Sequence, residues 1–126
     1  MKTYLRRILP LVILLMLMYG CKKEDPPKAC GVENPHENLI WLVELLDKSY
    51  CVEVYLIIFK GEEIIGVYDC PIGADYGATW FKCDGTMFCY YQGFTGHYTC
   101  PEDFAEAAKN KKLIYKQDKP LPKPKK

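Results

Sequence analysis

The stretch Cys51-Val-Glu-Val-Tyr-Leu-Ile-Ile-Phe59 carries the clearest secondary-structure signal in this chain of 126 residues. It is rich in β-branched and aromatic residues, and its side chains alternate between two sets that would point to opposite faces of a sheet. The segment Ile64–Cys70 has the same character, so the two segments predict an antiparallel hairpin. With Gly61-Glu62 as its two-residue loop, Tyr55 would lie opposite Tyr68.

A second hairpin is predicted over residues 80–90, because Asp84-Gly85 stands there between two apolar runs. Asp-Gly is favoured in two-residue hairpin loops, since both loop positions need a positive φ. In that register Cys83 and Cys89 point to opposite faces of the sheet, so we expect no bond between them. The segment Leu113–Tyr115 is a candidate for a last edge strand.

Helices are predicted on either side of the hairpins. Asn34-Pro35-His36-Glu37 has the pattern of a helix start, because asparagine caps well, proline is tolerated at the first position, and glutamate can close a capping box. This helix would run to about Lys48 and is apolar enough to need a sheet to pack on. Its apolar stripe consists of Leu39, Leu42, Val43 and Leu46. A shorter helix would follow Cys100-Pro101 and end at Ala108.

These elements predict an α+β fold, in which an N-terminal helix packs on a small antiparallel sheet built from two hairpins. Disulfides would staple this domain, and a short C-terminal helix would complete it. The predicted order along the chain is a signal peptide at 1–20, a tether at 21–29, the disulfide-rich domain at 30–115 and a disordered basic Pro/Lys tail at 116–126. A domain of this size buries a limited core, so disulfides would contribute much of its stability.

The N-terminal segment has the organisation of a secretory signal peptide. Positive residues at positions 2, 6 and 7 precede an apolar run from Ile8 to Tyr19. A helix over this run would be roughly 18 Å long, shorter than the bilayer core of about 30 Å. Gly20-Cys21 resembles the lipobox of bacterial lipoproteins, with Met18 and Tyr19 departing from its usual leucine and small residue. The resemblance implies cleavage before Cys21 and acylation of its thiol; the alternative is an ordinary signal peptide that is cleaved just after Cys21.

The number of cysteines supports lipidation. The chain has seven, and in the oxidising environment of an exported protein an odd count leaves one thiol over. If Cys21 carries lipid, six cysteines remain for three disulfides. We expect Cys30–Cys51 as one bridge, because these residues flank the predicted N-terminal helix. The six cysteines expected to be oxidised are Cys30, Cys51, Cys70, Cys83, Cys89 and Cys100.

Charge is divided unevenly along the chain. Residues 21–108 hold six lysines against fifteen acidic residues, whereas residues 109–126 hold eight lysines and one aspartate. An acidic exported domain is a poor partner for nucleic acid, so we expect none. The tail alternates proline with lysine and should be extended. It would either contact an anionic surface, such as lipid headgroups, or simply be solvated.

The glycine-rich loop around residues 90–98 is the predicted ligand site. Rigid aromatic side chains suit protein hot spots, and flat rings suit the faces of sugars. If these rings are exposed together, a binding function is favoured; if they are buried, a structural role is favoured. The predicted ligand-binding residues are Tyr90, Tyr91, Phe94, His97 and Tyr98.

No pattern of residues predicts catalysis or metal binding. The chain has only His36 and His97 as imidazole bases, and a Cys–His pair would need a free thiolate. An even number of cysteines in the mature domain argues against such a thiolate. The cysteines at 70, 83, 89 and 100 include no Cys-x-x-Cys pair, which a zinc site would favour. We therefore expect no enzymatic activity, no metal and no cofactor.

The chain also resembles the small cysteine-rich lipoproteins of Bacteroidetes over most of residues 34–104. The residues that carry the resemblance are Asn34-Pro35, Leu39-Ile-Trp41-Leu42, the hairpin Tyr55–Ile65, Cys83-Asp84-Gly85, Cys89, Gly93-Phe-Thr95-Gly96, Cys100-Pro101 and Asp103-Phe104. Members of that group usually have proline where Ile40 stands, and Cys30 and Cys51 are additions in this chain. The resemblance implies an exported lipoprotein with a small α+β domain and implies no activity.

The expected protein is a membrane-anchored lipoprotein of the cell envelope, held in the outer membrane by its N-terminal lipid. Lys23-Glu24-Asp25 resembles signals that direct such lipoproteins to the cell surface, and a periplasm-facing position is the alternative. The expected function is non-catalytic binding of a protein or glycan. A structural or assembly subunit of an envelope complex is the second candidate, and a small hydrolase or inhibitor-like domain is the third.

Overall fold

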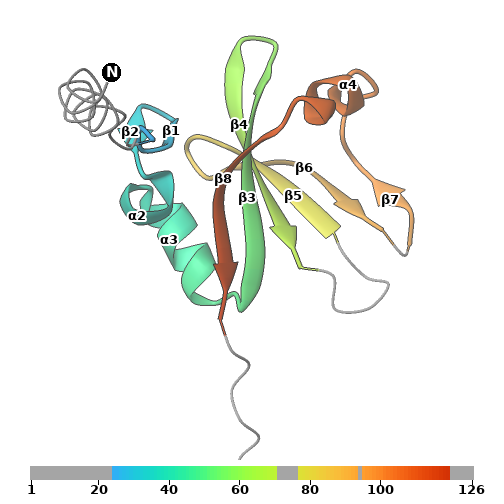
Figure 1. Ribbon diagram of the computed structural model, residues 1–126. Helices are drawn as coiled ribbons and strands as arrows, with labels where there is room; N and C mark the ends of the chain where they lie inside the picture. Colours follow the sequence, from blue (N-terminus) through green and yellow to red (C-terminus); the bar gives the residue numbers. More distant parts are fainter. Residues whose placement is uncertain (1–23, 71–76, 94, 120–126) are drawn as a thin grey trace, which may run out of the picture.

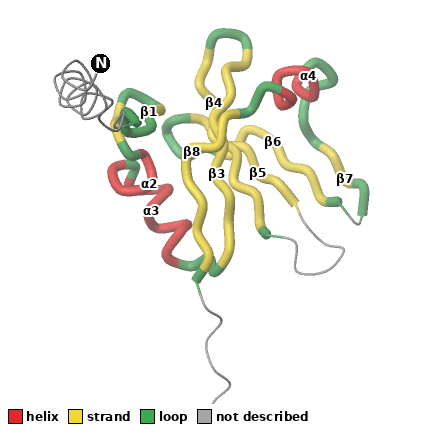
Figure 2. The backbone as a smooth tube through the Cα atoms, viewed as in Figure 1, coloured by secondary structure: helices red, strands yellow, loops and turns green. Residues whose placement is uncertain are grey.

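The computed structural model describes residues 24–70, 77–93 and 95–119. β-Strand is the most common secondary structure among these residues, as Figure 2 shows. A six-stranded antiparallel sheet has the order β7-β6-β5-β4-β3-β8, and a two-stranded sheet joins β1 and β2 (Figure 1). The strands are β1 Lys28–Ala29, β2 Val32–Glu33, β3 Cys51–Phe59, β4 Glu62–Asp69, β5 Gly77–Lys82, β6 Met87–Gln92, β7 His97–Tyr98 and β8 Lys112–Asp118. The helices are α2 Pro35–Asn38, α3 Ile40–Asp47 and α4 Phe104–Lys109.

The predicted α+β class is therefore wrong, and the protein is mainly β. The sheet is larger than two hairpins, because β7 and β8 add a strand at each edge. The predicted single N-terminal helix is also absent. Leu39 adopts extended backbone angles, φ −91° and ψ 106°, and separates the four-residue α2 from the eight-residue α3. Neither glycine nor proline stands at this break, although Asn38, just before it, is a second possible helix start in the sequence.

The central hairpin turns one residue earlier than predicted. Lys60 and Gly61 both have positive φ, 51° and 81°, and they form the two-residue loop between β3 and β4. Such a pair of angles matches the right-handed twist of the strands. Tyr55 consequently lies opposite Gly66, and the predicted pairing of Tyr55 with Tyr68 is wrong by two residues.

This register places Cys51 next to Cys70, and the two form a disulfide with a Cα–Cα distance of 5.3 Å. The amide of Cys70 also donates a hydrogen bond to the carbonyl of Cys51, over 3.2 Å. The predicted Cys30–Cys51 bridge is therefore wrong. Cys30 is bonded to Cys83, and Cys89 is bonded to Cys100, so Cys83 and Cys89 each have another partner, as the second hairpin predicted.

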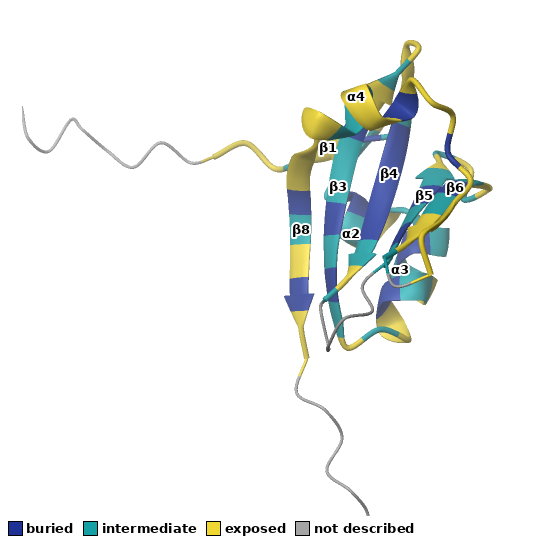
Figure 3. Cartoon of the chain, turned by 90° about the vertical axis from the view of Figure 1, so that its right-hand side faces the viewer, coloured by how far each residue is buried: buried dark blue, intermediate teal, exposed yellow. Residues whose placement is uncertain are grey.

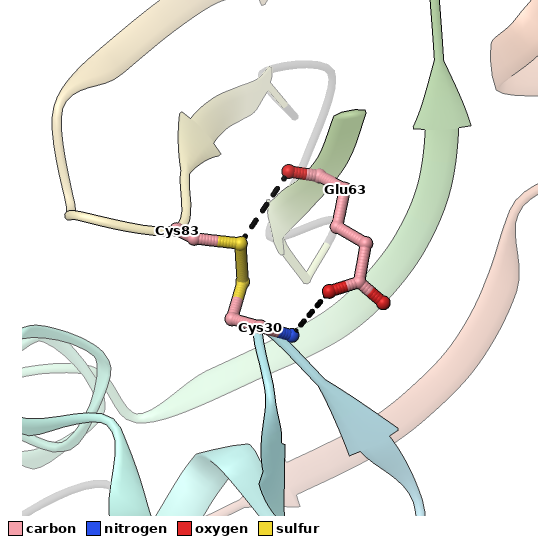
Figure 4. A group of neighbouring side chains, drawn as sticks. All are labelled: Cys30, Glu63 and Cys83. Carbon is pink, nitrogen blue, oxygen red and sulfur yellow. Dashed lines mark hydrogen bonds between the residues drawn. A yellow bond between two sulfur atoms is a disulfide. The ribbon is translucent and has the colours of Figure 1, made fainter. Parts of the chain in front are cut away.

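The Cys30–Cys83 disulfide joins the β1–β2 turn to the turn between β5 and β6. Cys30 has a φ of 55°, and its amide donates a hydrogen bond of 2.6 Å to a carboxylate oxygen of Glu63 on β4 (Figure 4). On the other side, the indole nitrogen of Trp41 donates to the carbonyl of Cys83 over 3.0 Å. Gly85 lies so close to this indole that a Cβ atom there would be 2.7 Å from Trp41 Cγ. Helix α3, strand β4, the β1–β2 turn and the β5–β6 turn thereby meet at one point.

The sheet buries apolar residues on both of its faces, and Figure 3 shows α4 on one side of the sheet with α2 and α3 on the other. The first cluster contains Leu42 and Leu46 of α3 together with strand residues. Its buried members are Ala29, Leu42, Leu46, Val52, Val54, Ile65, Val67 and Ile114. The second cluster lies on the face with α4, and its buried members are Ile57, Ile64, Trp80, Cys89, Cys100 and Phe104.

Strand β8 extends to Asp118, beyond the predicted domain boundary at Tyr115. Gln117 explains the extension, because its buried amide donates hydrogen bonds to the carbonyls of Leu46, at 3.0 Å, and Ser49, at 2.7 Å. It thereby satisfies carbonyl groups at the end of α3.

The predicted signal peptide, Cys21 and residues 120–126 of the predicted tail lie outside the described residues. No helix among the residues described is long and apolar enough to cross a membrane.

Removing the Cys30–Cys83 disulfide should cost more stability than removing Cys89–Cys100. The two bridges close loops with sequence separations of 53 and 11 residues. On the chain-entropy estimate, these separations correspond to about 4 and about 3 kcal/mol of unfolding free energy. Urea unfolding of Cys30→Ala/Cys83→Ala and Cys89→Ala/Cys100→Ala variants measures the difference. Peptide mapping without reductant is the control for the pairing, and a reversed order of stability would contradict the expectation.

Candidate ligand-binding groove

A row of side chains on the α4 face of the sheet forms the base of the candidate site. Tyr68 on β4 pairs with Ala78 on β5, Ala78 pairs with Tyr91 on β6, and Tyr91 pairs with Tyr98 on β7. Direct cross-strand partners point to the same face of a sheet. Tyr91 and Tyr98 are therefore neighbours, with ring centroids 6.2 Å apart in an edge-to-face arrangement. Both are exposed, at 39% and 45% of their surface.

Buried aromatic rings lie beside these tyrosines on the same face of the sheet. Trp80 contacts Tyr68 and Phe104 edge-to-face, at centroid distances of 5.5 and 5.1 Å. Trp80 and Phe104 are almost fully buried. The indole of Trp80 lies directly over Gly66, where an added Cβ would overlap its six-membered ring. The glycine therefore sets the height of this indole above the sheet.

Helix α4 forms the opposite wall of the groove. Phe104 enters the core, while Ala105 and Ala108 present only methyl groups and leave a hollow of about 310 Å³. None of the side chains that line it is charged, in a domain that is otherwise rich in acidic residues. The lining residues are Tyr68, Gly77, Ala78, Trp80, Tyr91, Tyr98, Phe104, Ala105 and Ala108. We refer to this hollow as the aromatic groove.

The predicted ligand-binding residues divide between the two faces of the sheet. Tyr91 and Tyr98 line the aromatic groove, whereas Tyr90 and His97 do not. The latter two stack on each other with centroids 5.4 Å apart, and the Tyr90 hydroxyl is 2.8 Å from His97 Nδ1. Adjacent residues on a strand point to opposite faces, which separates the two pairs. Phe94 lies outside the described residues.

Tyr90 borders a second hollow, of about 560 Å³, at the end of β5 and β6. This hollow shares Gly77, Ala78 and Tyr91 with the aromatic groove. The exposed carboxylate of Asp69 is also part of its lining, and Asp69 has no ion-pair partner in the part of the chain that the structure describes. The sharing of three lining residues makes the two hollows neighbours.

Sequence reasoning missed the residues that α4 and β4 contribute to the aromatic groove. Ala105 and Ala108 have small side chains that carry no recognisable binding signal. Tyr68 was visible as a strand residue, but the incorrect hairpin register paired it with Tyr55 instead of Glu53. Because an error of two residues leaves each side chain on the same face, it hid the strand partner of Tyr68 and not the side to which Tyr68 points.

Charged groups lie at the end of the groove nearest β8. The ammonium group of Lys111 lies 5.3 and 5.6 Å from the ring centroids of Tyr55 and Tyr68. Glu53 accepts hydrogen bonds from Lys116, at 2.8 Å, and from the Tyr55 hydroxyl, at 2.7 Å. These two bonds lower the pKa of Glu53, while the bond to Glu53 raises the pKa of Tyr55. The carboxylate of Glu53 therefore already has a cationic partner, Lys116, and a hydroxyl donor, Tyr55.

A separate group of metal-binding residue types surrounds the Cys30–Cys83 disulfide. Ligand atoms of Cys30, Glu63 and Cys83 lie within 4.8 Å of one another. Both sulfur atoms are consumed in the disulfide, and thiolates, not disulfides, are the usual metal ligands. The carboxylate of Glu63 is hydrogen-bonded to Cys30. In this oxidised form, the group serves to hold the turns together.

Comparisons with known proteins assign no family and no function to this chain. No protein-family model, curated protein or solved structure matches this chain. The groove combines two exposed tyrosine rings with two buried aromatic rings, and small residues line its wall and floor.

The Gly66→Ala substitution should destabilise the domain by about 1–3 kcal/mol, because the new methyl group would force the Trp80 indole into the aromatic groove. Gly61→Ala is the matched control, since its added Cβ would meet nothing within 4 Å and its positive φ alone should cost about 1 kcal/mol. Urea unfolding measures both losses. If the two variants lose the same stability, the indole does not depend on Gly66 for its position.

Proposed function

We propose that this protein is a lipid-anchored, non-catalytic binding protein of a bacterial envelope, and that the aromatic groove receives a protein or glycan ligand. The observation that carries the binding proposal is the joint exposure of Tyr91 and Tyr98 in a hollow that buried aromatic rings also line. A rigid ring loses little conformational entropy on binding and offers a large apolar area. The same joint exposure disfavours the alternative role as a structural or assembly subunit.

The composition of the groove supports a neutral contact surface. Gly77 and Ala78 allow a ligand to approach the backbone of β5, and the hydroxyl groups of Tyr91 and Tyr98 can donate and accept hydrogen bonds. Pockets that combine apolar walls with a few polar groups are typical of binding sites. A sugar ring or an extended peptide would satisfy both features.

The pairing of cysteines supports the lipid anchor. Six of the seven cysteines are bonded to one another, so Cys21 has no cysteine partner left within the chain. Three disulfides are typical of a protein that folds in an oxidising compartment. Together with the apolar run that ends at Gly20, this supports acylation of Cys21. We propose an outer-membrane position at the cell surface, with a periplasm-facing position as the alternative.

The groove should lose its ligand when its exposed rings are removed. In a glycan array and in pull-downs of envelope proteins, we expect a Tyr91→Ala/Tyr98→Ala variant of the full chain to bind roughly tenfold more weakly or worse. Tyr50→Ala is the matched control, because Tyr50 is 46% exposed and lies outside the groove. Thermal unfolding must show that both variants remain folded. Equal capture by the double variant and the control would exclude the groove as the binding site.

The anchor is tested by metabolic labelling with an alkyne fatty acid in a bacterial host that processes lipoproteins. The wild-type chain should incorporate the label, and Cys21→Ser should not, because the acylated thiol is absent. The label must be absent while the three disulfides are retained, which peptide mapping checks. Label on the Cys21→Ser protein, or none on the wild type, would refute the anchor.

A further inference from the structure

A lysine ammonium group is held at one end of the aromatic groove. Lys111 follows helix α4, and its amide donates a hydrogen bond of 3.4 Å to the carbonyl of Ala108, which lines the groove. Its ammonium group lies 5.6 Å from the ring centroid of Tyr68, another lining residue, and 5.3 Å from that of Tyr55. Both distances fall within the range of about 6 Å in which an aromatic ring attracts a cation. Two rings therefore keep this positive charge beside the groove.

This ammonium group has no ion-pair partner among the described residues. Neighbouring carboxylates are paired with other lysines: Glu53 with Lys116 at 2.8 Å, and Glu106 on α4 with Lys109 at 2.6 Å. The charge of Lys111 reaches Glu53 only through space, where it is the weakest of the influences that lower the pKa of that carboxyl group. The ionic interaction of Lys111 is therefore available to a ligand.

The floor of the groove favours a sugar over an extended peptide. The strands that form it, β4 to β7, pair with one another, so their backbone groups are used in the sheet ladder. A peptide that binds as an added strand needs a free strand edge, which this face of the sheet does not offer. A sugar needs ring faces to pack on and hydroxyl groups to bond with, and Tyr91 and Tyr98 present both.

The length of the groove sets the size of the ligand. Tyr68, Ala78 and Tyr91 are successive partners across three neighbouring strands. Two strand spacings, or roughly 9.5 Å, therefore separate the exposed ring of Tyr91 from the tyrosine beside the ammonium group. One sugar ring is shorter than this distance, so a ligand that contacts both ends must contain at least two linked sugars.

We propose that the aromatic groove binds an acidic oligosaccharide, with one sugar on Tyr91 and Tyr98 and the carboxylate of another on the ammonium group of Lys111. This inference rests on the proposed function, because it names the ligand class for the same groove. A carboxylate accepts a charge-assisted hydrogen bond from an ammonium group, which is stronger than a bond between neutral groups. Since the groove lining is uncharged, Lys111 is the residue that distinguishes an acidic sugar from a neutral one.

Titration calorimetry with a matched pair of sugars tests the role of charge. The full, lipidated chain in detergent is titrated with tetragalacturonate and with its fully methyl-esterified form, which keeps the sugars and removes their charge. We expect the acid to bind roughly fivefold more tightly at low ionic strength. The difference should shrink as salt is added, because exposed charges are screened. Tetraglutamate serves as a third ligand, which carries carboxylates on a peptide.

Three lysine variants assign the preference to one side chain. Lys111→Gln should bind the acid and the ester equally, whereas Lys111→Arg should keep the preference because it keeps the charge. Lys112→Gln is the matched control and should also keep the preference. Lys112 pairs with Leu56, which packs against the cluster on the other face of the sheet. Thermal unfolding must show that all three variants remain folded.

Equal affinity of the wild type for the acid and the ester would overturn the proposal, and so would a preference that survives in Lys111→Gln. Tighter binding of tetraglutamate than of tetragalacturonate, or no binding of either sugar, would overturn the assignment to an acidic glycan. The Tyr91→Ala/Tyr98→Ala variant distinguishes these failures from failure of the proposed function. If it binds tetragalacturonate as tightly as the wild type does, the groove is not the binding site. If it loses both sugars while the wild type binds them equally, the groove stands and only the role of Lys111 fails.

Discussion

The two-residue loop at Lys60 and Gly61 fixes the register on which the rest of this domain depends. β3 and β4 lie inside the sheet, and their pairing brings Cys51 next to Cys70 and sets Glu53 opposite Tyr68. The pairing of β4 with β5 then places Ala78 opposite Tyr68 and Trp80 opposite Gly66, where no larger side chain would fit. One disulfide and one side of the candidate site therefore depend on the register that this turn sets.

A small domain with both sheet faces covered has few residues left for each layer. One face depends on α3 and the other on the short α4, and neither helix is long enough to be stable alone. The disulfides compensate for this. Cys30–Cys83 fixes the turns that contact Trp41, and Cys89–Cys100 fixes the chain just before Phe104 enters the core. For each helix, the neighbouring disulfide thus contributes more to holding it in place than the intrinsic stability of the helix does.

The sequence pattern predicted local features better than long-range ones. The strand Cys51–Phe59 follows from alternation and the second hairpin from Asp84-Gly85, and both are confirmed. The loop of the second hairpin has three residues instead of two, with a bulge between Trp80 and Phe81. The central loop was placed wrongly because lysine with positive φ is uncommon, so Gly61-Glu62 looked the better choice. The error of two residues hid the Cys51–Cys70 bridge. Likewise, Tyr91 and Tyr98 were predicted as site residues, but nothing local could show that α4 would supply the opposite wall.

Strand β8 ends the described sheet, and its outer edge leaves a row of backbone groups without a neighbouring strand. Such an edge invites pairing with another copy of the same chain. Lys112 and Lys116 lie on this strand and Lys119 follows it, and lysines are typical of sheet edges that resist such pairing. The β8 lysines would therefore disfavour the association of two of these domains edge to edge.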